Sequence, residues 1–206
     1  MTRDLIELRA TEIQVRMVTG DDGRPKVRGY GLVYNSRSEI MTEPDETGQP
    51  RKFRELIKPG AARKSLAEAD LRVLAHHDPK QILGRRSAGT AKFGEDEIGI
   101  WYEADPPDCG YARDICTLLI RGDVDGSSFS FTALEDDWDD TEEKGVQLRT
   151  LRSIHVFEMG PVSWPAYKGA RAMYRSSGPI ATAPAIVYPT PEQLVLLNRL
   201  RLAELV

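Results

Sequence analysis

The chain has 206 residues, of which 40% are hydrophobic and 29% charged, and its net charge is -4. This balance is typical of a globular protein with one main core, and the negative charge argues against a duplex-binding domain, which normally presents a basic face. No apolar run approaches the ~20 residues that cross a bilayer, and the opening "MTRDLIELR" is not a secretory signal. We therefore expect a soluble, intracellular protein that binds neither nucleic acid nor membrane.

Periodicity and turn residues predict a β-rich domain over residues 1–175. Strands are predicted where apolar and polar residues alternate, and helices where apolar residues recur every three to four positions. In chain order we expect a strand at 11–20, a turn at 21–24, a strand at 26–34, a mobile loop at 36–52, a helix at 59–69, a strand at 71–77, a hairpin of 91–93 with 98–104, a helix at 111–121, a strand at 126–133, a solvated acidic loop at 135–143 and a strand at 148–159.

The composition changes at residue 176. Residues 176–189 are rich in proline, alanine, serine and threonine, which is typical of a linker. The following "TPEQ" resembles a capping box with proline at the first helical position, and a leucine-rich stretch comes after it. We expect a C-terminal helix or tail over residues 190–206.

The cysteines and histidines form neither a disulfide nor a metal-binding pattern. On one helix, Cys109 and Cys116 would lie about 10 Å apart, because each residue rises 1.5 Å. This separation is too large for a disulfide, and we expect two reduced thiols in the core. The three histidines have no paired cysteines beside them, so no zinc-ligand spacing is present.

The stretch "DGSSFSF" at 125–131 fits either a nucleophile-bearing strand or an ordinary strand with small polar residues. Alternation places Phe129 and Phe131 toward the core and Ser128 on the opposite face. Gly126 lacks a side chain on the face of Ser128, so a peptide backbone can approach its hydroxyl. A serine nucleophile needs a base, and the stretch by itself contains none.

Two other positions are candidates to work with this serine. His77 stands at the end of a predicted strand, before Asp-Pro, and functional residues often lie at such boundaries. Alternation places it on the opposite face from His76. Glu158 alternates in phase with apolar residues two and four positions earlier, so its carboxylate needs a partner. That partner is either a histidine ring, as in a triad, or Arg152 in a structural ion pair.

Five segments, in order from about Val27 to Ala172, resemble the prohead (procapsid maturation) proteases of tailed bacteriophages, serine peptidases related to herpesvirus assemblin. They read "VRGYGLVYN", "FRELIKPGAARKSL", "VLAHHDPKQILGR", "RGDVDGSSFSF" and "FEMGPVSWPAYKGARA". The serine segment of the family is commonly G-x-S-[FI]-G-F, and here Ser130 replaces its second glycine. Tyr167 and Lys168 replace the commoner asparagine after "PA".

The resemblance implies an α+β fold with a β-barrel-like antiparallel core flanked by helices, as in assemblin. It implies an acyl-enzyme mechanism without metal or cofactor, in which Ser128 is the nucleophile, His77 the general base and Glu158 the residue that orients His77. Assemblin has a second histidine as its third member, which keeps His155 as the alternative, although alternation turns it to the other face. Analogy with paired arginines of assemblin makes residues 84–86, "GRR", the candidate oxyanion donors.

The resemblance also implies the substrate and the partners. The substrate would be the scaffolding segment of the major capsid protein, cut inside the procapsid before DNA packaging, and the protease would also cut itself. It would be made in the host bacterial cytoplasm, and a homodimer is a further expectation because assemblin relatives dimerise. Two alternatives stay open: a catalytically inactive protease-like scaffold or assembly protein, suggested by Ser130, and a β-barrel binding module.

Overall fold

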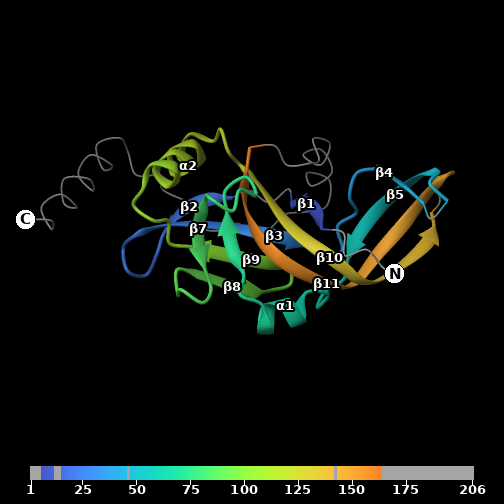
Figure 1. Cartoon of the computed structure of the whole chain (residues 1–206), viewed down its shortest axis with the longest axis horizontal. Helices are drawn as coiled ribbons and strands as arrows, with labels where there is room; N and C mark the ends of the chain where they lie inside the picture. The colour runs from blue at the N-terminus through green and yellow to red at the C-terminus, as the bar shows by residue number, and fades with distance from the viewer. Residues whose placement is uncertain (1–5, 12–14, 46, 142, 164–206) are drawn as a thin grey trace, which may run out of the picture.

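The computed structural model describes residues 6–11, 15–45, 47–141 and 143–163 (Figure 1). The expected linker at 176–189 and C-terminal helix at 190–206 lie outside these residues. The elements are β1 (Glu7–Thr11), β2 (Arg16–Thr19), β3 (Pro25–Val33), β4 (Met41–Pro44), β5 (Pro50–Ile57), α1 (Arg63–Glu68), β6 (Arg72–Leu74), β7 (Ile82–Arg85), β8 (Ala91–Glu95), β9 (Gly99–Ala104), α2 (Gly110–Arg121), β10 (Gly126–Asp140) and β11 (Val146–Val162).

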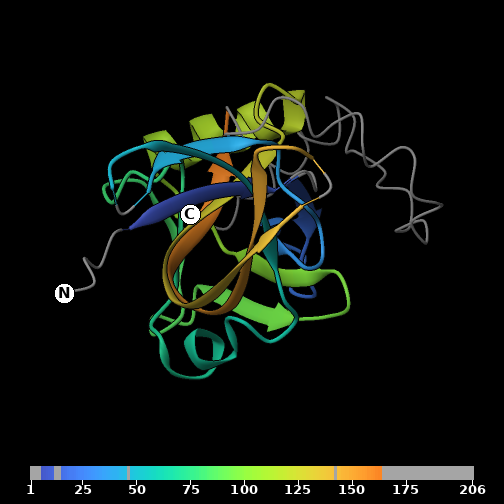
Figure 2. The same ribbon diagram turned by 90° about the vertical axis from the view of Figure 1, so that its right-hand side faces the viewer.

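Two sheets enclose the core. The larger has the order β1-β10-β11-β5-β4, with β6 paired to β11 and β7 to β6, and the smaller has the order β2-β3-β9-β8. The two views place α2 above and α1 below the strands, on opposite sides of the molecule (Figures 1 and 2). This is the β-rich α+β domain expected. The barrel-like antiparallel core is wrong in two respects, because β11 pairs in parallel with β5 and β6, and the described strands do not close into a barrel.

The long hairpin of β10 and β11 organises the larger sheet. Phe129 and Phe131 of β10 are buried and stack with ring centroids 5.1 Å apart, as the alternation of the sequence predicts. The smaller sheet packs closely against β11, since a Cβ on Gly31 of β3 would lie 2.3 Å from the sulfur of Met159. A Cβ on Gly160 would lie 1.9 Å from the carbonyl oxygen of Leu74, so this glycine lets the end of β6 contact β11.

Two segments expected to be loops are strands. The residues expected to form a loop at 36–52 contain β4 and the start of β5. Their prolines are tolerated because Pro44 and Pro50 face each other at the turn of this hairpin, Pro44 on the outermost strand and Pro50 as the first residue of β5. The acidic stretch at 135–143 instead continues β10 as far as Asp140. Its one aromatic residue, Trp138, packs on the buried Phe53 with centroids 5.1 Å apart, and this contact keeps the polar strand on the sheet.

Other elements are confirmed with changed ends. The hairpin of β8 and β9 and the strand β11 are as predicted. The helix α2 ends at Arg121, and Gly122 caps it with the left-handed φ of 80° that glycine favours at a helix end. The helix expected at 59–69 is shorter, because Gly60 has a φ of 81° and cannot be helical. Cys109 and Cys116 are partly buried against the core rather than inside it.

Candidate functional site

His77 is positioned by a tight turn rather than by a strand. β6 ends at Leu74, and both His76 and His77 have a left-handed backbone, with φ of 54° and 59°. The prediction that the two rings lie on opposite faces of one strand is therefore wrong. Such φ values are uncommon without glycine and persist where surrounding contacts hold them. Here the backbone N–H of His76 donates to the carbonyl of Pro161 at 2.9 Å, which ties the turn to β11.

Ser128 lies on β10, directly beside this turn. Its partner across the hairpin is Gly160, which has no side chain to cover the hydroxyl. The Nε2 atom of His77 lies 2.8 Å from the Oγ of Ser128, and Ser128 is 4% exposed. The serine and histidine singled out from the sequence, 51 residues apart, are therefore in hydrogen-bond contact.

Glu158 contacts the other side of the same ring. Its Oε1 lies 2.8 Å from the Nδ1 of His77, and the residue is 7% exposed. The predicted alternative, an ion pair with Arg152, is wrong because Arg152 pairs with Asp137. Serine, imidazole and carboxylate in series form the arrangement that can raise the nucleophilicity of a hydroxyl.

His155 lies on the other face of β11. Its ring packs edge-to-face on Phe157 with centroids 4.8 Å apart, whereas Glu158 is on the buried face with Ile154 and Val156. The structure therefore brings Glu158, and not His155, to His77. The alternation of β11 predicted this difference, because residues an odd number of positions apart point to opposite faces.

A residue that the sequence did not indicate also meets the serine. The Oγ of Ser128 lies 2.7 Å from the carbonyl oxygen of Arg9, on β1. A hydroxyl has one proton, so it donates either to this carbonyl or to the Nε2 of His77. Strand β1 itself was not predicted. A signal was present in the alternation of Leu8 and Ala10 with charged neighbours, but it is short.

The arginines proposed as oxyanion donors are engaged elsewhere. Arg85 pairs with Asp70, its Nε lying 2.7 Å from the carboxylate. Arg86 donates to the backbone carbonyls of Leu66 and Ala69 at 2.8 Å each, at the end of α1. The structure therefore does not bring these two guanidinium groups into contact with Ser128.

Ser127 and Tyr102 support the strand from within the core. Both are fully buried, and the Tyr102 hydroxyl lies 3.1 Å from the Oγ of Ser127. Burial raises the pKa of the Tyr102 hydroxyl, so it stays neutral. The neighbouring Ser130 is also buried and lies opposite Glu158 in the hairpin register. The three serines of "DGSSFSF" thus have three different environments.

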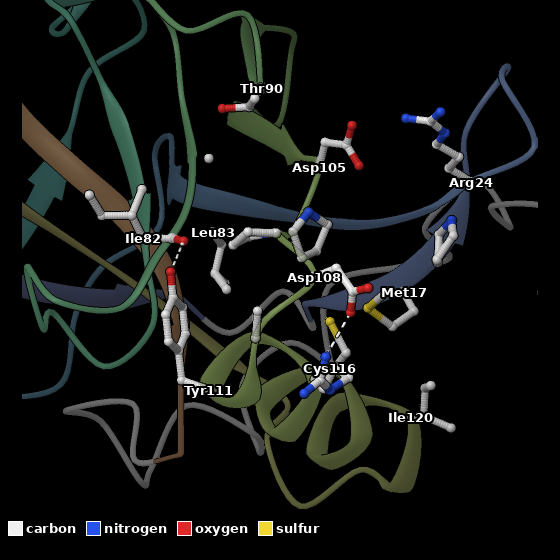
Figure 3. Close-up of a pocket in the computed structure, with 16 residues that line it drawn as sticks. Met17, Arg24, Ile82, Leu83, Thr90, Asp105, Asp108, Tyr111, Cys116 and Ile120 are labelled. Carbon is white, nitrogen blue, oxygen red and sulfur yellow. Dashed lines mark hydrogen bonds and ion pairs between the residues drawn. The ribbon is translucent and has the colours of Figure 1, made fainter. Parts of the chain in front are cut away.

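A cavity of about 610 Å³ lies elsewhere, between α2 and strands β2 and β7 (Figure 3). Ile82, Tyr111 and Cys116 are among its lining residues, and the Tyr111 hydroxyl donates to the Ile82 carbonyl at 2.8 Å. It contains none of the three site residues.

In the described ranges no group of three histidine, cysteine or acidic residues could hold a metal ion. No described helix is both long and apolar enough to span a membrane.

The sequence matches the family described as caudovirus prohead serine protease over residues 11–181. No curated protein matches the chain. Among solved structures, the capsid assembly protease gp21 of bacteriophage T4 is similar, with 13% sequence identity and a TM-score of 0.45, over 77% of this chain and 97% of that one. Because the family match spans most of the chain and includes the segments of all three contacting residues, the chain belongs to the caudovirus prohead serine proteases.

Proposed function

We propose that the chain is a serine endopeptidase whose nucleophile is Ser128. The observation that carries this proposal is the series of two 2.8 Å contacts that joins Ser128 to His77 and His77 to Glu158. Both end members are buried, so each contact forms in a medium where electrostatic interactions are stronger than in water. The family to which the chain belongs supports the same reaction class.

The three residues have distinct roles in this mechanism. The Nε2 of His77 takes the hydroxyl proton of Ser128 while Oγ forms a bond to a peptide carbonyl carbon. Glu158 accepts the Nδ1–H of His77, which selects the correct tautomer and stabilises the imidazolium that forms. His77 then gives its proton to the leaving amine as the C–N bond breaks, and a water activated by His77 hydrolyses the acyl-enzyme.

We assign the substrate from the prohead family. The protease cuts the scaffolding segment of the major capsid protein inside the procapsid, and also cuts itself. It would be made in the host cytoplasm and enclosed during assembly. Since the reaction needs only a serine, a base and a carboxylate, it requires no metal or cofactor.

Co-expression with the capsid protein of the same phage tests this function. Wild type is expected to shorten the capsid protein, and Ser128→Ala to leave it at full length, as judged by gel and intact mass. Ser130→Ala is the matched control, a buried serine two residues away, and is expected to process normally. Equal processing by wild type and Ser128→Ala would overturn the assignment, and an absence of processing by both would support an inactive scaffold.

A further inference from the structure

Strand β1 lies along the strand that carries the nucleophile. It pairs with β10 in antiparallel register, with Ala10 opposite Ser128 and Arg9 opposite Phe129. Addition of an extended segment to a sheet edge is one of the general ways in which proteins bind peptides. The Ser128 hydroxyl lies 2.7 Å from the carbonyl oxygen of Arg9. In a serine protease, the carbonyl group that is attacked lies next to the hydroxyl of the nucleophilic serine. Arg9 therefore occupies the position of the residue before a scissile bond.

The side chain of Arg9 enters a charged site that the rest of the domain provides. Its Nε and one terminal nitrogen lie 2.7 and 2.9 Å from the two carboxylate oxygens of Glu55, a bidentate contact. Its guanidinium carbon also lies 5.4 Å from the ring centroid of Phe131, within the range of a cation–π interaction. The Arg9 side chain is 12% exposed and that of Glu55 is 3% exposed.

Glu55 is a buried carboxyl group that two arginines contact. Burial raises the pKa of its carboxyl group, and the charges of Arg9 and Arg149 oppose that effect. Arg149 lies 3.2 Å from Glu55, but it is shared, since it contacts Glu7 and Asp136 at 2.6 Å. Without the charges of β1, the site holds the carboxyl groups of Glu55 and Asp136 and the guanidinium of Arg149. An incoming basic side chain would therefore replace the partner that Glu55 loses with Arg9.

The contact between Ser128 and the Arg9 carbonyl competes with the contact between Ser128 and His77. When the Ser128 hydroxyl donates to the Arg9 carbonyl, its single proton is not directed at His77, and the oxygen cannot be activated as a nucleophile. A substrate must first displace this strand, and with it the ion pair of Arg9 with Glu55. β1 has only five residues and pairs on the larger sheet with β10. Its displacement would break the ladder with β10 and the ion pairs of Arg9 and Glu7, so a competing peptide must supply equivalent contacts.

We infer that the position of β1 is the substrate position: a peptide binds along β10 with an arginine side chain on Glu55, and β1 occupies this position as an internal inhibitory strand. The inference rests on the proposed function and adds a substrate class, peptides with arginine before the cut bond. It also makes Glu55 the specificity-determining residue, acting through its buried carboxylate as an acidic pocket does for a basic side chain.

Covalent labelling of the full-length protein tests the inference with two diphenyl phosphonate probes, one with an arginine-like side chain and one with a norleucine side chain. Arg9→Ala removes the guanidinium of β1 from Glu55. This variant is expected to react with the arginine-like probe at least tenfold faster than wild type. The double variant Arg9→Ala, Glu55→Gln is expected to lose the preference for that probe, so that the ratio of the two rates falls to about one. Arg54→Ala, which removes a neighbouring arginine paired to the more exposed Glu143, is the control and is expected to behave as wild type.

Three results separate the inference from the function. If a small fluorophosphonate labels Ser128 but Arg9→Ala changes neither rate nor preference, the inference is wrong and the function stands. If no variant is labelled at Ser128, the proposed function fails. If the double variant melts well below wild type, Arg9→Ala is tested instead with benzamidine, a small aryl amidinium. Protection of Ser128 from the fluorophosphonate by benzamidine supports the acidic site. A lack of protection at millimolar benzamidine contradicts it.

Discussion

Replacing Glu158 by glutamine removes one charge from the buried contact with His77 and keeps the shape of the side chain. The two atoms in contact are 2.8 Å apart, and the charge centres of imidazolium and carboxylate are about 4 Å apart. At that distance two unit charges attract by about 4 kcal/mol with an effective dielectric constant of 20. Each 1.36 kcal/mol lost from the transition state slows a reaction tenfold. We therefore expect Glu158→Gln to slow the reaction of Ser128 by about 10²–10³-fold.

The measurement is the rate at which a small fluorophosphonate labels Ser128, followed by intact mass, with thermal melting to show that the variant is folded. His155→Ala is the matched control, because His155 lies on the other face of β11 against Phe157, and it is expected to label within about twofold of wild type. A loss of less than about threefold in Glu158→Gln would refute the electrostatic reasoning. A large loss in His155→Ala alone would transfer the orienting role to that histidine.

Two further predictions concern packing and thiol chemistry. Gly160→Ala places a Cβ 1.9 Å from the Leu74 carbonyl oxygen, so we expect the free energy of unfolding to fall by about 3 kcal/mol and the melting temperature by roughly 6–12 °C. Gly110→Ala, where the new Cβ meets no atom within 4 Å, should melt close to wild type, and equal melting of both variants would contradict the close approach of β6 to β11. Burial raises the pKa of Cys116 to about 11, so its alkylation by iodoacetamide, followed by mass spectrometry, should be slow at pH 8 and rise about tenfold per pH unit to pH 10. A plateau below pH 9 would contradict that pKa.

The regular patterns of the sequence predicted most of the elements that carry the site. Alternation placed Phe129 in the core and Glu158 on the buried face of β11, since a strand repeats its side-chain direction every two residues. The same reasoning failed at His77, because β6 ends at Leu74 and the next residues turn with left-handed backbones. A periodic argument holds only while the element continues, and no residue pattern showed where this strand would stop.

Two of the missed elements are held by contacts distant in sequence. The acidic stretch of β10 has the composition of a loop, and it is a strand because Trp138 packs on Phe53 and Arg149 pairs with Asp136. Likewise, β1 has too few residues for periodicity to reveal it, and its place depends on Arg9 reaching Glu55, 46 residues away. Charged residues are usually solvated, and only the tertiary structure shows which of them are buried together.

By itself, the sequence determined the β-rich fold class and the family resemblance, because these depend on residue types and on local spacing. Ser128, His77 and Glu158 were candidates on the same grounds, and the resemblance gave them their roles. The tertiary structure decided which of these groups touch, since three segments spread over 82 residues converge only when β6 and its following turn pack on the β10–β11 hairpin. It alone brought Arg9 to the same hydroxyl. Contacts of this kind arise from chain topology, and no local preference of the residues encodes them.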